Sequence, residues 1–271
     1  MSPLFARSPT KTWLFLSVIF LMFVSVPLLL GLFVNPPVGI SISATILLLL
    51  TSMLYRRDET TLAELGLDLG RRNISFLVLG IALGCLFFIL LFVIQMTSND
   101  IHVQLNKNVN YFSIATGLFL LIPAVLVEEL IFRGYCFKRT VDKAGITKTN
   151  LIFALLFLVW HWIALDAWGN FYMMIGLLTT AFGHLLFSTA LIRSGTLYFP
   201  IGIHLGNNWT SHYFFSSNTK GIAPEVSSDS FFLVTMPAET ITPLHSVLNY
   251  MVTFIYALLF TWIIWKWRIR F

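Results

Sequence analysis

The chain has 271 residues, of which 57% are hydrophobic and only 11% are charged. Soluble domains carry about 25% charged residues, so this composition excludes an ordinary soluble protein and predicts a polytopic membrane protein. The net charge of +5 predicts no nucleic-acid partner, because basic residues on cytoplasmic loops account for it. The two cysteines, Cys85 and Cys136, lie in or beside apolar segments, and we expect buried thiols rather than a disulfide or metal ligands.

A helix needs about 20 apolar residues to cross a bilayer. The chain predicts about eight spans in one all-α transmembrane bundle, so that residues 1–271 form a single membrane domain. The first segment is longer than the apolar core of a signal peptide and is expected to stay as a span. The expected spans are residues 13–34, 38–54, 74–95, 111–137, 149–165, 170–192, 197–215 and 245–265.

Basic residues cluster beyond alternate span ends, and the intervening loops hold few of them. All clusters fall on one side if both termini are cytoplasmic, as expected for a multi-pass protein of the cell membrane. The clusters are Arg7 with Lys11, Arg56 and Arg57 with Arg71 and Arg72, Lys138 and Arg139 with Lys143, Arg193, and Lys266 with Arg268 and Arg270. The longest loop on the other side is residues 216–244, with some interfacial structure expected around Phe231 and Phe232.

Two spans carry glycines four residues apart, Gly80 with Gly84 and Gly202 with Gly206. Small residues at this spacing let helices approach closely, so each pair predicts a tight helix–helix contact.

Three charged residues lie together at the end of the fourth span, Glu128, Glu129 and Arg133. Charges within a membrane are costly and usually pair or mark function. Glu129 and Arg133 are four residues apart and can pair on one helix face. Glu128 points about 100° away from Glu129 at 3.6 residues per turn, and is left for another role.

The other polar residues within spans are two histidines on separate helices, His161 and His184, and a group on the seventh span. His204 and Asn208 share a helix face there, and Asn207 is expected to make a helix–helix hydrogen bond. His184 has no implied partner and is expected to be structural. Glu128, His161, His204 and Asn208 fall about 10–18 Å from the cytoplasmic ends of their spans, at 1.5 Å per residue. They predict one cavity site in the cytoplasmic half of the bundle.

A carboxylate, two imidazoles and a carboxamide in such a cavity can hydrolyse an amide. The carboxylate acts as general base on water, one imidazole orients the water, and the other imidazole with the carboxamide stabilises the oxyanion. Alternatively, Glu and His side chains hold a zinc ion that activates the water. The residue types serve both versions, so the sequence leaves Zn²⁺ and a metal-free site equally open.

Three motifs resemble those of the CAAX proteases and bacteriocin-processing enzymes, the CPBP family of intramembrane proteases that includes the Rce1-type prenyl-protein endopeptidases. They are Glu128-Glu129-x-x-x-Arg133, Phe157-x-x-x-His161 and His204-x-x-x-Asn208. The resemblance implies a helical bundle around a cavity open to the cytosol and to lipid, with residues 110–215 as the catalytic core.

The same resemblance implies a role for each motif residue. Glu128 is the catalytic carboxylate, His161 helps it to activate water, His204 and Asn208 form the oxyanion site, and Glu129 and Arg133 support them. If a metal is used, its ligands are Glu128, His161 and His204. The family is named for metalloproteases, and a glutamate-dependent mechanism without metal has also been proposed for it.

The expected function is therefore an intramembrane endopeptidase acting on a peptide or a membrane-protein tail, with membrane lipid as the other partner. One alternative is a non-catalytic immunity or peptide-binding protein that uses the same cavity. A small transporter with a proton relay is disfavoured, because no inverted pair of broken helices is visible. The oligomeric state is not indicated by the sequence.

Overall fold

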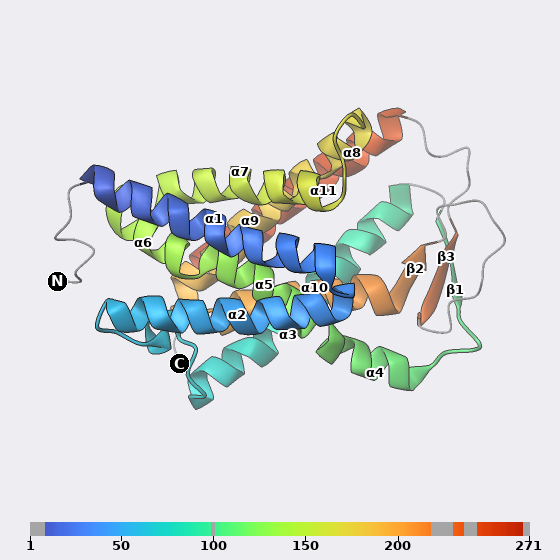
Figure 1. Cartoon of the computed structure of the whole chain (residues 1–271). Coiled ribbons are helices and arrows are strands. Elements are labelled where there is room, and N and C mark those ends of the chain that lie inside the picture. Colours follow the sequence, from blue (N-terminus) through green and yellow to red (C-terminus); the bar gives the residue numbers. More distant parts are fainter. Residues whose placement is uncertain (1–8, 99–100, 218–229, 236–242, 268–271) are drawn as a thin grey trace.

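The computed structural model describes residues 9–98, 101–217, 230–235 and 243–267 (Figure 1). Its helices in chain order are α1 (Pro9–Phe33), α2 (Pro36–Arg57), η1 (Leu62–Leu65), α3 (Arg71–Ser98), α4 (Tyr111–Leu120), α5 (Ile122–Arg133), α6 (Tyr135–Ala144), α7 (Ile146–Ala164), α8 (Phe171–Gly176), α9 (Leu178–Ser194), α10 (Tyr198–Trp209), the π-turn η2 (Thr210–Phe214) and α11 (Pro243–Lys266). Three short strands, β1 (His102–Leu105), β2 (Phe215–Ser217) and β3 (Phe232–Thr235), complete the described chain.

Within the described residues, seven helical segments are long and apolar enough to cross a membrane. The all-α polytopic bundle predicted from the sequence is thereby confirmed. The seven segments correspond to all the expected spans except 197–215. That stretch is also helical, but α10 has 12 residues and η2 adds five, which is short for a full crossing.

The fourth expected span is interrupted twice and runs on past its predicted end at residue 137. One break, at Leu121, precedes Pro123 near the start of α5, where proline is well tolerated because the first turn has no hydrogen bond to lose. The other break is Gly134, where an added Cβ would press against the carbonyl oxygen of Leu130. The segment continues as α6 to Ala144, so the basic residues expected in a loop lie on a helix.

Arg139 of α6 is the one member of that basic cluster that the structure buries. Its guanidinium donates to Asp58 Oδ2 at 2.8 Å and to Glu64 Oε1 at 2.6 Å, and it pairs with Asp142 at 3.3 Å. Burial raises the pKa of the Glu64 carboxyl, but the hydrogen bond and charge of Arg139 outweigh it and hold that pKa below its ordinary value. The prediction of Arg139 as a loop charge was wrong, because two of its three acidic partners, Asp58 and Glu64, are distant in the sequence.

Two other basic residues form hydrogen bonds with neighbouring helix ends. Arg72 at the start of α3 donates to the Ser194 carbonyl at the end of α9 at 2.6 Å. Arg193 donates to the Trp267 carbonyl, just after α11, at 3.0 Å. These ends therefore lie at the same end of the bundle, and the β-sheet lies at the opposite end (Figure 1).

The two glycine pairs predicted as separate packing signals face each other. A Cβ added at Gly80 would meet the Gly202 backbone, and one added at Gly84 would meet the carbonyl of Ile203. On the other helix, a Cβ at Gly206 would meet the carbonyl of Ile81. This contact brings α3 and α10 backbone to backbone, and Cys85 Sγ donates to the Gly206 carbonyl at 3.5 Å.

The small sheet has the order β1-β3-β2, with β1 antiparallel and β2 parallel to β3. Its aromatic residues pack against the end of α3, where Phe92 and Phe215 have ring centroids 4.2 Å apart. Only interfacial structure around Phe231 and Phe232 was expected here, and the strand pairing itself was missed. The rest of the expected loop, residues 218–229 and 236–242, lies outside the described residues.

Candidate active site

A buried charge network connects α5 to α10. Glu129 and Arg133 are one turn apart and have no exposed side-chain surface. A single oxygen, Glu129 Oε1, accepts from Arg133 Nη1 at 3.1 Å and lies 2.9 Å from His204 Nδ1. A carboxylate can only accept, so Nδ1 of His204 carries the proton of this bond. The bond fixes the ring of His204 and turns its Nε2 toward Glu128.

Glu128 lies on a different face of α5 from Glu129 and is not part of that ion pair. Its Oε2 is 3.8 Å from His204 Nε2. The same oxygen is buried, and among the described residues it has no hydrogen-bond partner. The side chain as a whole remains 23% exposed. A buried carboxylate oxygen without a donor is costly, and such a group calls for an explanation.

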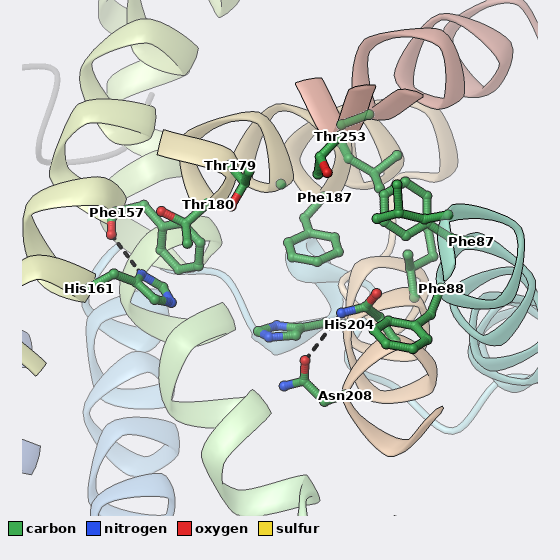
Figure 2. A pocket seen from close by; sticks show the side chains of 16 residues that line it. Phe87, Phe88, Phe157, His161, Thr179, Thr180, Phe187, His204, Asn208 and Thr253 are labelled. Atoms are coloured by element: carbon green, nitrogen blue, oxygen red, sulfur yellow. Dashed lines mark hydrogen bonds between the residues drawn. The ribbon is translucent and has the colours of Figure 1, made fainter. Parts of the chain in front are cut away.

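A cavity of about 270 Å³ opens beside His204, and Figure 2 shows its lining side chains. Three of the four predicted catalytic residues line it, with His161 of α7 reaching in across from His204 and Asn208 of α10. Glu128 is not among the lining residues and adjoins the cavity through His204. The other lining residues are mainly apolar, with three threonines: Phe87, Phe88, Leu91, Phe157, Thr179, Thr180, Gly183, Leu186, Phe187, Ile203, Asn207, Thr253 and Ala257.

The three threonine hydroxyls offer no proton to the cavity, because each donates to a backbone carbonyl three or four residues earlier in the chain. Thr179 bonds to Gly176 at 2.8 Å, Thr180 to Leu177 at 2.7 Å, and Thr253 to Asn249 at 2.8 Å. Side-chain donors on the described cavity wall are therefore its asparagines, and a histidine donates to the cavity only when its Nε2 is protonated.

His161 is held by its own helix. Its Nδ1 lies 2.8 Å from the Phe157 carbonyl oxygen, and a carbonyl only accepts, so Nδ1 carries a proton. In the neutral ring Nε2 is then an acceptor, and Figure 2 shows the ring directed into the cavity. The hydrogen bond thus explains the Phe-x-x-x-His spacing, which places the carbonyl one helical turn before the ring.

The two asparagines bond to each other rather than across helices. Asn207 Nδ2 donates to Asn208 Oδ1 at 3.4 Å (Figure 2), so the interhelical bond expected of Asn207 was wrong. Because its oxygen is occupied, Asn208 presents its amide N–H groups to the cavity. The next residue, Trp209, donates to the Ile114 carbonyl of α4 at 2.8 Å and anchors this end of α10.

Aromatic rings enclose the network. The Arg133 guanidinium lies 4.4 Å from the ring centroid of Phe157 and 5.0 Å from that of Phe187. Phe187 stacks on His204 with centroids 4.7 Å apart and an angle of 17° between the planes. Sequence analysis missed Phe187, because one phenylalanine among 26 in an apolar chain carries no distinguishing signal.

His184, expected to be structural, is fully buried on α9 among Phe137, Phe153 and Phe157. Neither of its ring nitrogens has a hydrogen-bond partner in the described part of the chain. It does not line the cavity.

The zinc alternative can be tested against the donor set. Across the described ranges, no three side chains of His, Cys, Asp or Glu are grouped closely enough to hold a metal ion. The predicted ligands Glu128, His161 and His204 do not form such a group as they are arranged in the described part of the chain.

Comparison with protein families places these residues in a known context. Residues 110–210 match the family model described as "Type II CAAX prenyl endopeptidase Rce1-like". Comparisons with curated proteins and with solved structures gave no match. The matched segment contains Glu128, His161, His204 and Asn208, together with the network that joins α5 to α10. The chain therefore carries an Rce1-like domain of the CPBP family over residues 110–210, the family that its three motifs predicted.

Proposed function

We propose that the protein is a CAAX-type intramembrane endopeptidase that cuts a peptide or a membrane-protein tail by means of a water activated by Glu128. One observation carries the proposal. The buried Oε2 of Glu128 has no hydrogen-bond donor among the described residues, and it lies 3.8 Å from the Nε2 of a histidine whose other nitrogen is fixed. At this separation a water can bridge the two polar atoms from one side, within hydrogen-bonding distance of both.

In the proposed reaction, Glu128 removes a proton from water as the water oxygen bonds to the carbonyl carbon of the substrate. His161 orients that water by accepting from its second O–H at Nε2. The carbonyl electron pair moves onto oxygen, and the C–N bond then breaks as the amine takes the proton from Glu128. General-base catalysis of this kind contributes about 10²–10⁴-fold to a rate.

The oxyanion is stabilised by donors on α10. Asn208 offers its amide N–H because Asn207 already occupies its oxygen. His204 donates from Nε2 when that nitrogen is protonated, while Nδ1 stays on Glu129. Donors that are fixed before the reaction cost no reorganisation when the charge develops.

Glu129 and Arg133 act by holding His204 rather than by touching substrate. Glu129 Oε1 fixes the ring, and the guanidinium balances the buried carboxylate at 3.1 Å. An Asp or Glu that orients a histidine in this way is a recurring feature of hydrolytic sites.

We propose further that the end of the bundle carrying Arg72 and Arg193 faces the cytoplasm, following the distribution of basic residues. The chain would then be a multi-pass protein of the cell membrane with both termini inside.

The test uses purified protein in detergent and a quenched fluorescent peptide ending in a farnesylated CAAX sequence. Glu128→Gln is expected to lower kcat by at least about 10²-fold, since it removes the base but keeps the shape. The matched control is Glu59→Gln, the same change at an exposed glutamate, which should cleave like the wild type. A Glu128→Gln enzyme with wild-type kcat would rule out this mechanism.

The same assay separates catalysis from binding alone. If the wild type binds the peptide without cutting it, and Glu128→Gln binds it equally well, the peptide-binding alternative replaces the proposal for this substrate. An unprenylated peptide of the same sequence tests whether the farnesyl group is required.

A further inference from the structure

We propose that Phe187 is a positioning residue for this reaction, holding His204 through its ring face. The inference rests on the proposed function, because it concerns the histidine assigned there to the oxyanion. It starts from a repeated contact. One guanidinium, that of Arg133, touches two phenylalanine rings, and each ring touches one site histidine.

The first half of this arrangement involves Phe157. Arg133 lies 4.4 Å from the Phe157 centroid, and the rings of Phe157 and His161 have centroids 4.4 Å apart at an angle of 69°. Phe157 also holds His161 through its backbone carbonyl at 2.8 Å. Phe157 is the first residue of the motif Phe157-x-x-x-His161, so the sequence already indicates that it belongs to the site.

The second half involves Phe187, which belongs to none of those motifs. Its ring is nearly parallel to His204, at 17°, with centroids 4.7 Å apart, and Arg133 lies 5.0 Å from its centroid. The side chain is only 7% exposed. His204 is thus fixed at two points, by Glu129 at Nδ1 and by Phe187 on its face.

The hydrogen bond at Nδ1 and the contact on the ring face together restrict the His204 ring more than either contact does alone. The hydrogen bond at Nδ1 sets the distance of the ring from α5, but the ring can still swing about that bond. A parallel ring at 4.7 Å blocks this swing and keeps Nε2 aimed at Glu128, 3.8 Å away. Aromatic contacts of this type are directional and contribute beyond the area they bury.

Phe157 and Phe187 are also connected to each other through Arg133. Arg133 contacts Phe157 on α7 and Phe187 on α9, so the same guanidinium positions both rings. His161 and His204 reach the cavity from different helices (Figure 2), and this common contact relates their positions.

The experiment compares kcat and KM for the fluorescent farnesylated peptide among Phe187→Leu, Phe187→Tyr and Phe88→Leu. Phe88 lines the same cavity, and within the described residues its ring packs against Phe92 and Phe215 rather than against a histidine. Phe88→Leu therefore removes an equal amount of ring from the same wall and should alter KM.

Phe187→Leu is expected to lower kcat by roughly tenfold, because a loosened oxyanion donor costs transition-state stabilisation. Phe187→Tyr keeps the ring face and should restore kcat to within about threefold of the wild type. Each variant is first checked for a monodisperse peak in gel filtration. Should Phe187→Leu fail that check, Phe187→Met, which fills more of the volume without an aromatic ring, is measured in its place.

The inference is overturned if Phe187→Leu changes only KM, as Phe88→Leu does, or if Phe187→Tyr is as slow as Phe187→Leu. Glu128→Gln is run in parallel to separate the two proposals. Full activity of Glu128→Gln would refute the proposed mechanism, whereas an inactive Glu128→Gln with unchanged kcat in Phe187→Leu would refute only the role of Phe187.

Discussion

The fully buried pair Glu129–Arg133 is the feature of the site whose energetics can be tested most directly. Arg133→Met removes the charge that balances Glu129 and both ring contacts of the guanidinium, while keeping a long apolar side chain. Glu129→Gln leaves the opposite problem, an arginine buried without a carboxylate at 3.1 Å. Removing one partner of a buried pair costs about 3–5 kcal/mol, because the other charge is left uncompensated.

The size of the coupling follows from these numbers. If the two changes were independent, the double variant would lose about 6–10 kcal/mol. In the double variant no unbalanced charge remains, so it should lose no more than the worse single variant. The expected coupling energy is therefore about 3 kcal/mol or more. At about 2 °C per kcal/mol for a chain of this size, each single variant should melt about 6–10 °C below the wild type.

The assay is thermal unfolding in detergent, followed by tryptophan fluorescence, for the wild type, both single variants and the double variant. Arg56→Met makes the same change at an exposed arginine and should lie within about 0.5 kcal/mol of the wild type. Should the two single losses add in the double variant to within about 0.5 kcal/mol, the pair is not coupled and the reasoning fails.

Three further predictions concern other parts of the molecule. Because Arg139 lowers the pKa of Glu64, this pair stabilises the fold above the ordinary glutamate pKa, and the gain is lost as pH falls through the lowered value. Glu64→Gln should therefore flatten the dependence of melting temperature on pH below about 4.5. Because Glu64 is partly exposed, the change in the free energy of unfolding should be less than about 1 kcal/mol, and an unchanged slope contradicts the prediction. Gly206→Ala should lower the free energy of unfolding by about 1–3 kcal/mol, because the added methyl group presses on the Ile81 carbonyl. Gly31 has open space around it, so Gly31→Ala should be neutral or stabilising. Equal melting temperatures of the two variants would argue against the tight α3–α10 contact. Asn208→Asp removes the amide donors with little change of shape and should lower kcat by about 10²–10³-fold, and a change confined to KM would show that Asn208 is no oxyanion donor.

Local patterns in the sequence predicted the helices and the composition of the site. Apolar runs gave the spans, because a bilayer sets the length of a helix that crosses it. The spacing of Glu129 and Arg133 predicted their pairing, since residues four apart share a helix face. The same period separated Glu128 from Glu129 and left one carboxylate outside the ion pair.

Contacts between distant residues could not be predicted in this way. Arg139 reads as a loop charge until its partners Asp58 and Glu64 are seen beside it. The glycines of α3 and α10 each predict a close contact, but only the fold shows that they face each other. The role proposed for Phe187 depends on its parallel contact with His204, which lies on another helix.

The sequence by itself therefore determined the membrane class, the helices and the kinds of group at the site, because these depend on hydrophobicity and on a period of 3.6 residues. The tertiary structure decided which groups meet. It placed one oxygen of Glu129 between Arg133 and His204, and it left Glu128 Oε2 without a donor in the described part of the chain. The physical reason is that the role of a carboxylate depends on its neighbours in space, and the decisive neighbour here, His204, lies 75 residues from Glu129 along the chain.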